Sequence, residues 1–188
     1  MKKLVVGITG ASGVILGIRL LQVAREAELA ETHLVISAAA KATIAQETDW
    51  KVSDVDALAN ATYDVRDVGA AIAGGSFVTA GMAIIPCSVK TLSAVANSYS
   101  ADLISRAADV TLKEGRPLVL VVRETPLHLG HLRLMAHAAE IGAVILPPVP
   151  AFYARPQSVQ DIVDEIVGRT LLRLGIENDL YLKWAGMK

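Results

Sequence analysis

The sequence contains few of the residues that mark several large functional classes. Of its 188 residues one is cysteine and 4% are aromatic, and the net charge is −1. A single cysteine excludes an intramolecular disulfide framework and is typical of a reducing compartment. The scarcity of aromatic side chains and of excess positive charge argues against a nucleic acid partner, because such proteins rely on stacking rings and basic surfaces.

Long apolar runs are also missing. None approaches the ~20 residues that a membrane span needs, so we expect no membrane partner. The start of the chain resembles a signal peptide, with Lys2 and Lys3 before an apolar stretch, but Gly, Thr and Ser interrupt that stretch and Arg19 follows. We therefore expect no targeting segment and a cytoplasmic protein.

The hydrophobic fraction, 53%, exceeds the roughly 45–50% of average globular domains. Two explanations fit this excess. The core could be rich in alanine and well buried, or apolar surface could line subunit interfaces, which resemble a core cut in half. We favour a homo-oligomer. The chain length fits one domain with a sizeable core.

Apolar, β-branched runs alternate with helical patterns along the chain. The expected strands are Leu4–Ile8, His33–Ile36, Met82–Ile85, Leu118–Val122 and Ala143–Leu146. The expected helices are Val14–Ala27, Ala38–Gln46, Thr91–Ala96, Leu103–Lys113, Leu127–Ile141 and Val159–Leu174. This alternation predicts an α/β fold in one domain, residues 1–188, with a doubly wound, mostly parallel, Rossmann-like sheet. Residues 68–81 should form a loop that could contain a short strand, and residues 175–188 a tail that docks.

The first expected strand ends in a turn of small residues, Thr9-Gly10-Ala11-Ser12-Gly13, before a helix. Glycine lets the backbone turn sharply and approach a ligand, and a helix N-terminus attracts an anion. A dinucleotide site would need an acidic residue after the second strand, where Ser37 stands. The turn therefore favours a mononucleotide such as FMN over NAD.

Polar residues follow several other expected strands, including Ser37, Ser88 and Arg123. In a parallel sheet these strand ends lie along one edge, where hydroxyl and N–H groups can hold a phosphate and a heterocycle. For any one of the serines, the alternative role is a helix N-cap. Glu124 could move protons if burial raises its pKa, or could form a salt bridge. Glu47 ends a helix, where a carboxylate is unfavourable, which hints at function.

Other candidate groups have plainer explanations. Arg106 and Lys113 lie two helical turns apart and could hold a phosphate, although such pairs are commonly solvated. Cys87 has no paired histidine in the sequence pattern and is expected to be a small buried hydrophobe. The histidines of the expected helix Leu127–Ile141 have no acidic or cysteine partner at ligand spacing, so no metal is expected.

The order of short motifs along the chain resembles that of the UbiX-type flavin prenyltransferases, which are also called phenolic or aromatic acid decarboxylase subunits. The motifs are Gly10-Ala11-Ser12-Gly13, Glu47-Thr48-Asp49, Pro86-Cys87-Ser88, Arg106-Ala107-Ala108-Asp109-Val110, Arg123-Glu124-Thr125-Pro126, Gly142-Ala143-Val144-Ile145-Leu146-Pro147-Pro148 and Phe152-Tyr153. The resemblance covers nearly the whole chain.

The resemblance implies a metal-independent transferase that joins a dimethylallyl group from dimethylallyl phosphate to N5 and C6 of reduced FMN. It also implies a UbiD-type decarboxylase as recipient of the prenylated FMN, and a dodecamer built from trimers with sites shared between subunits. The implied catalytic residues are Ser12, Glu47, Glu124 and Trp184. The implied FMN-binding residues are Gly10, Ala11, Ser12, Ser37, Ser88, Val89, Lys90, Thr91 and Arg123. The residues implied around the prenyl phosphate are Arg106, Lys113, Arg123, Tyr153 and Arg169.

Two other functions remain open from the sequence. The protein could be an FMN-binding decarboxylase that acts directly on an aromatic acid, because related flavoproteins share the fold. It could also be a non-catalytic FMN carrier subunit.

Overall fold

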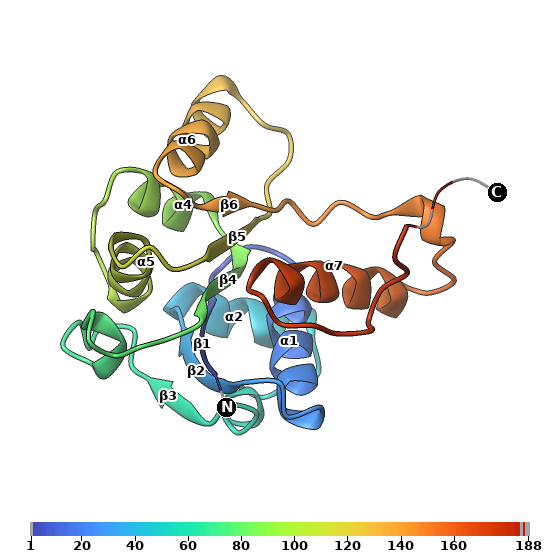
Figure 1. The fold of residues 1–188 in the computed structure, drawn as a ribbon, viewed down its shortest axis with the longest axis horizontal. Helices are drawn as coiled ribbons and strands as arrows, with labels where there is room; N and C mark the ends of the chain where they lie inside the picture. Colours follow the sequence, from blue (N-terminus) through green and yellow to red (C-terminus); the bar gives the residue numbers. More distant parts are fainter. Residues whose placement is uncertain (1, 185, 187–188) are drawn as a thin grey trace.

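The computed structural model describes residues 2–184 and 186. Six strands form one sheet in the order β3-β2-β1-β4-β5-β6, and every neighbouring pair is parallel (Figure 1). The strands are β1 (Lys3–Ile8), β2 (Glu31–Ile36), β3 (Ala61–Tyr63), β4 (Gly81–Cys87), β5 (Leu118–Val122) and β6 (Val144–Ile145). The helices are α1 (Val14–Glu26), α2 (Ala38–Glu47), α3 (Val52–Asp56), α4 (Val89–Ala96), α5 (Leu103–Lys113), α6 (Leu129–Glu140) and α7 (Val159–Arg173), with 3-10 helices η1 (Ala71–Ala73) and η2 (Phe152–Ala154).

Helices cover both faces of the sheet, which explains why the strands are almost continuously apolar. Every residue of β4 and β5 is buried. One core cluster joins the sheet to α1 and α7, and a second joins it to α4 and α5. Figure 1 shows the two groups of helices on opposite sides of the strands. The predicted doubly wound, Rossmann-like fold is confirmed, and the sheet is parallel throughout.

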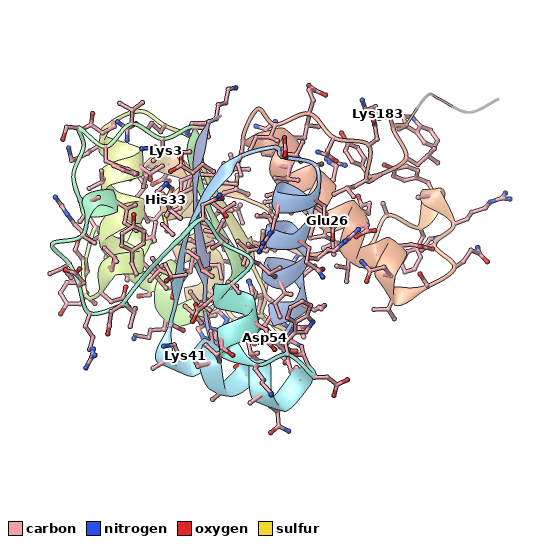
Figure 2. All side chains as sticks on the ribbon, turned by 90° about the horizontal axis from the view of Figure 1, so that it is seen from below. Lys3, Glu26, His33, Lys41, Asp54 and Lys183 are labelled. Carbon is pink, nitrogen blue, oxygen red and sulfur yellow. The ribbon has the colours of Figure 1, made fainter. Side chains whose placement is uncertain are left out.

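The strand order reverses between β1 and β4. In open α/β sheets, ligands bind beyond the carboxyl ends of the strands at such a reversal. Figure 2 shows Lys3, at the amino end of β1, on the opposite side of the molecule from Lys41 on α2, which follows the carboxyl end of β2. The end near α2 is therefore where a ligand site is expected.

The boundaries of the larger elements lie close to the predicted ones, and α5 coincides with its prediction. The main differences are short elements. Strand β3 and helix α3 were not predicted, and residues 68–81 contain η1 in place of a short strand. Pro86 and Cys87, predicted to follow a strand, belong to β4 itself.

An extended segment leaves the body of the molecule after β6, carries η2, and returns through α7 (Figure 1). We call residues 147–158 the arm. It exposes large apolar side chains, with Val149 70% and Phe152 74% exposed. Of the predicted docking tail, residues 175–188, positions 185, 187 and 188 lie outside the described residues. No helix in the described part of the chain is both long and apolar enough to cross a membrane.

Candidate active site

A cavity of about 500 Å³ lies at the reversal between β1 and β4. Two helices begin at its wall. Ser37 caps α2 by accepting a hydrogen bond from the Ala40 N–H at 3.1 Å, and Ser88 caps α4 by accepting from the Thr91 N–H at 3.4 Å. The free N–H groups and positive ends of both helices make this wall suited to an anion. The lining residues are Thr9, Gly10, Ser37, Ala38, Ala39, Val65, Arg66, Val68, Ser88, Lys90, Thr91, Ala101 and Asp102.

The small-residue turn after β1 packs tightly against the start of α2. A Cβ atom at Gly10 would lie 2.4 Å from the Cβ of Ala39, so glycine is required there. Ala11 and Ser12 complete the turn, and Gly13 adopts a left-handed φ of 96° before α1. This close approach places the turn directly beside the cavity.

Glu47 lies at the C-terminal end of α2, yet its carboxylate reaches the start of α1. Its Oε2 accepts a hydrogen bond from the Gly13 N–H at 2.8 Å. Partial burial opposes ionisation, but hydrogen bonds from the Ser12 side chain and the N–H groups of Gly13 and Val14, together with nearby Arg123, lower the pKa of Glu47. The positive N-terminus of α1 thus compensates for the unfavourable position of this carboxylate on its own helix.

The structure gathers most of the predicted FMN residues at one place. Gly10, Ser37, Ser88, Lys90 and Thr91 line the cavity, whereas Val89 lies in the same helical turn and lines a neighbouring groove beside α6. Two helix N-termini, hydroxyl groups and a lysine are the donors that a mononucleotide phosphate needs. The residues present therefore fit FMN.

Other predicted site residues lie outside this lining. Arg123 follows β5, with its N–H donating to the Cys87 carbonyl at 3.2 Å. Glu124 is exposed, and its Oε1 accepts from the Thr125 N–H at 2.9 Å. Arg106 pairs with Asp109 at 3.0 Å on the same helix, and Lys113 pairs with Glu114 at the opposite end of α5 from the cavity.

The remaining predicted residues form a second group beside the arm. The rings of Tyr153 and Trp184 meet edge to face, with centroids 5.2 Å apart. The Arg169 guanidinium lies over the Tyr181 ring, 6.0 Å from its centroid. Among the described residues of one protomer, neither this group nor Arg106 and Lys113 lines the cavity.

The structure also shows the surroundings of Cys87 and of the histidines that the sequence analysis considered as nucleophile and metal ligands. Cys87 is fully buried, and burial raises the pKa of its thiol far above the usual range, which agrees with a buried hydrophobe. The rings of His128 and His131 lie close together, with centroids 3.6 Å apart and planes tilted by 33°. Within the described residues, no set of three or more His, Cys, Asp or Glu side chains is placed to hold a metal ion.

Sequence reasoning missed several lining residues, and Thr9 is the one for which the sequence carried a signal. Thr9 lines the cavity, and its side chain is bonded to β4. The available signal was its position, since it directly follows the last residue of β1. A polar side chain there is expected to reach the ligand edge of the sheet.

The fold and the cavity define a mononucleotide-binding α/β protein. The flavoprotein family matches residues 1–171. The chain is 60% identical over 188 residues to flavin prenyltransferase UbiX of Escherichia coli K12, covering 99% of this chain and 100% of that protein. It is 54% identical to the mitochondrial flavin prenyltransferase PAD1 of Saccharomyces cerevisiae, covering 100% of this chain and 77% of that protein.

Solved structures agree with these relatives. The structure of AnUbiX (PadA1) in complex with FMN and dimethylallyl pyrophosphate superposes with a TM-score of 0.96 at 47% identity, covering 100% of this chain and 99% of that one. The dodecameric FMN-dependent UbiX-like decarboxylase from Escherichia coli O157:H7 gives 0.95 at 49% identity, covering 98% and 100%. The chain belongs to the flavoprotein family and, within it, to the UbiX-type flavin prenyltransferases.

Proposed function

We propose that the protein is a metal-independent prenyltransferase that joins a dimethylallyl group from dimethylallyl phosphate to N5 and C6 of reduced FMN. The observation that carries the proposal is the cavity between β1 and β4, present in a chain 60% identical to a flavin prenyltransferase. The neighbour solved with FMN and dimethylallyl pyrophosphate shares its fold along the whole chain.

FMN supplies the nucleophilic nitrogen and carbon atoms of the reaction. The N-termini of α2 and α4, with Ser37 and Ser88, bind its phosphate. Ser12 lies by the reacting edge, where its hydroxyl is held by the Glu47 carboxylate. Glu47 and Glu124 are the proposed acid and base groups, because the Glu47 carboxylate is bound to the start of α1 and Glu124 follows the carboxyl end of β5.

Ionisation of an allylic phosphate leaves negative charge on the departing phosphate. Fixed cationic side chains stabilise that charge as it develops. We assign this role to Arg106, Lys113, Arg123 and Arg169, with Tyr153 as a hydroxyl donor and Trp184 as an aromatic wall beside it. Holding both substrates in a dry cavity removes much of the entropic barrier and keeps water from the allylic cation.

The distribution of these residues supports a homo-oligomer, and we propose that it is a dodecamer built from trimers. Arg106 and Lys113 do not line the cavity of one protomer, so a neighbouring subunit would supply them. The exposed apolar side chains of the arm supply interface area, and a homologue at 49% identity is dodecameric. Residues 175–188 would pack near the site or against a neighbouring subunit.

The product would pass to a separate UbiD-type decarboxylase in the cytoplasm. Family membership supports this partner, and a composition with one cysteine supports a reducing compartment. The protein itself would then make the cofactor without decarboxylating an aromatic acid.

The first experiment mixes the purified protein anaerobically with reduced FMN and dimethylallyl phosphate, then measures the mass of the extracted flavin. A gain of one prenyl unit is expected, and a sample without the prenyl donor is the control. Unmodified FMN from protein shown to bind it would contradict the transferase. Release of carbon dioxide from an aromatic acid without a partner protein would then indicate a direct decarboxylase. If no carbon dioxide is released either, the protein would be a carrier of FMN.

A further inference from the structure

Thr9 is a polar side chain buried at the point where the strand order reverses. It is 1% exposed. Its Oγ1 donates a hydrogen bond to the Pro86 carbonyl at 2.7 Å and accepts one from the Ser88 N–H at 2.8 Å. Its own N–H also donates to the Pro86 carbonyl, at 3.2 Å. One residue therefore joins the carboxyl end of β1 to the carboxyl end of β4 through three hydrogen bonds.

The bond to Ser88 determines where α4 begins. Ser88 is the N-cap of α4, and its Oγ lies 3.2 Å from the Thr91 Oγ1. Ser88, Lys90 and Thr91 all line the cavity. Because the Thr9 hydroxyl binds the backbone of the cap residue itself, it fixes the first turn of α4 relative to β1 and to the turn at Gly10.

The first turn of α2 lines the same cavity as the first turn of α4, through Ser37, Ala38 and Ala39. An anion held between two helix N-termini depends on the distance and angle between them, because the charge effect falls off within the first turn. A buried hydroxyl that holds one of the two helices therefore affects how tightly the phosphate end of a ligand is bound.

We propose that Thr9 is a positioning residue that holds the N-terminus of α4 in place to receive the phosphate of the flavin. This inference rests on the proposed FMN site and adds a residue to it. The Thr9 hydroxyl acts through Ser88, because it accepts a hydrogen bond from the Ser88 N–H and so orients the N-cap of α4.

The test compares FMN with riboflavin, which has the same ring system without the phosphate. Thr9→Val keeps the side-chain shape and removes the hydroxyl. We expect it to weaken FMN binding about 10-fold, the order of effect of losing a buried hydrogen bond that leaves its N–H partner unpaired. Riboflavin binding should stay within about 2-fold of wild type under the same estimate. Thr9→Ser, which keeps the hydroxyl, should restore the preference for FMN.

Steady-state kinetics give a second readout of the same variants. With Thr9→Val the KM for reduced FMN should rise while kcat at saturating FMN stays near the wild-type value, because the reacting edge of the flavin is unaffected. Thr9→Val that binds FMN as tightly as wild type, or that loses FMN and riboflavin affinity equally, would overturn the inference. Thermal melting of each variant confirms that it is folded at the assay temperature.

A measurement on the wild-type protein does not depend on any variant folding. Hydrogen exchange of the segment around Ser88 should be slow in the flavin-free protein, because the Thr9 bond is present before the ligand arrives. Exchange as fast as that of surface amides would overturn the inference. Wild-type protein that fails to bind FMN would instead contradict the proposed function, and binding without prenyl transfer would contradict only the transferase.

Discussion

The Glu47 side chain makes its hydrogen bonds to a helix other than its own. It lies on α2, but its carboxylate is bound by Ser12 and by the N–H groups at the start of α1, with Arg123 nearby. These contacts lower its pKa, so it is an ionised carboxylate across the neutral range, placed where a proton acceptor or a fixed negative charge would act.

Replacement of Glu47 by Gln should lower kcat about 100-fold, at the lower end of the 10²–10⁴-fold contribution of acid–base groups. The amide oxygen can still accept from the Gly13 N–H, so FMN affinity should be retained. The measurement is kcat for prenyl transfer beside FMN titration. Asp49→Asn, at an exposed carboxyl two residues away, is the matched control and should leave kcat unchanged.

Glu124 differs from Glu47 in its surroundings. It is exposed in the protomer, and within the described part of the chain its one hydrogen bond comes from the Thr125 N–H, the next in the chain. If it transfers a proton near the flavin, Glu124→Gln should slow turnover about 10-fold or more while FMN still binds. Single-turnover kinetics would measure the effect, and unchanged turnover would remove Glu124 from the acid and base candidates.

The sequence could predict that residues directly after a strand lie near the site. It could not predict contacts between residues that are far apart in the chain. Ser37 and Ser88 were predicted because strand ends in a parallel sheet share one edge. The contact between Glu47 and Gly13 joins residues 34 apart, and nothing in the local sequence encodes it. The same holds for Thr9 and Ser88, which are 79 apart.

At the scale of elements, the position of α1 depends on one glycine. A Cβ atom at Gly17 would lie 2.4 Å from the Ile85 carbonyl oxygen on β4 and 2.9 Å from the Ile8 side chain on β1. Helix α1 therefore contacts the sheet backbone directly, which keeps its N-terminus beside the turn that follows β1.

Gly17→Ala should lower the free energy of unfolding by about 1–3 kcal/mol, because backbone cannot yield as a flexible side chain would. This overpacking outweighs the ~1 kcal/mol that alanine gains over glycine in a helix. Denaturant unfolding measures the change. The control is Gly69→Ala, where the nearest atom to an added Cβ, Oδ1 of Asp67, lies 3.6 Å away, and its stability should match wild type. Equal stability of both variants would contradict the close contact.

The length of the apolar run around a strand decided whether the sequence revealed it, and β6, with two residues, was found because it lies within the run Ala143–Leu146. Strands β1, β2, β4 and β5 carry at least five buried positions each, so their apolar runs stand out. Strand β3 has three residues, none fully buried, and its place in the sheet comes from pairing with β2. A pattern that short cannot be distinguished from a loop, because its conformation is fixed by its neighbour.

At the scale of the whole molecule, the arm presents apolar surface that one protomer does not cover. Phe152 is 74% exposed and lies beside Tyr153, whose ring contacts Trp184. Phe152→Asp should disrupt the proposed oligomer, because a charged group at the centre of an interface is strongly unfavourable. Light scattering should record a smaller particle, and prenyl transfer should fall more than FMN binding.

Val78→Asp is the control for the arm variant. Val78 is similarly exposed, at 73%, but lies in the loop before β4, away from the arm. An oligomer that survives Phe152→Asp with full activity would show that the arm is not needed to complete the site.

The attachment of the arm to the body involves a buried carboxyl group whose titration affects the stability of the whole protein. Glu165 on α7 is 9% exposed. Burial raises the pKa of Glu165. The charge of Arg169 and a hydrogen bond from the Ala151 backbone in the arm oppose this rise. A raised folded-state pKa means that the stabilising contribution is complete below the usual pKa of Glu and is lost as pH rises through the folded value.

Glu165→Gln should therefore raise the melting temperature relative to wild type at pH 7 and lose this advantage as pH falls below about 4, where the wild-type carboxyl is also neutral. A gain near 2–4 °C would correspond to about 1 kcal/mol for a protein of this size. Melting curves from about pH 3 to 8 measure the difference. The exposed Glu177→Gln serves as the control. A Glu165→Gln variant that is less stable than wild type at pH 7 would mean that the charge of Arg169 and the hydrogen bond from Ala151 outweigh burial, and that the ionised carboxylate holds the arm in place.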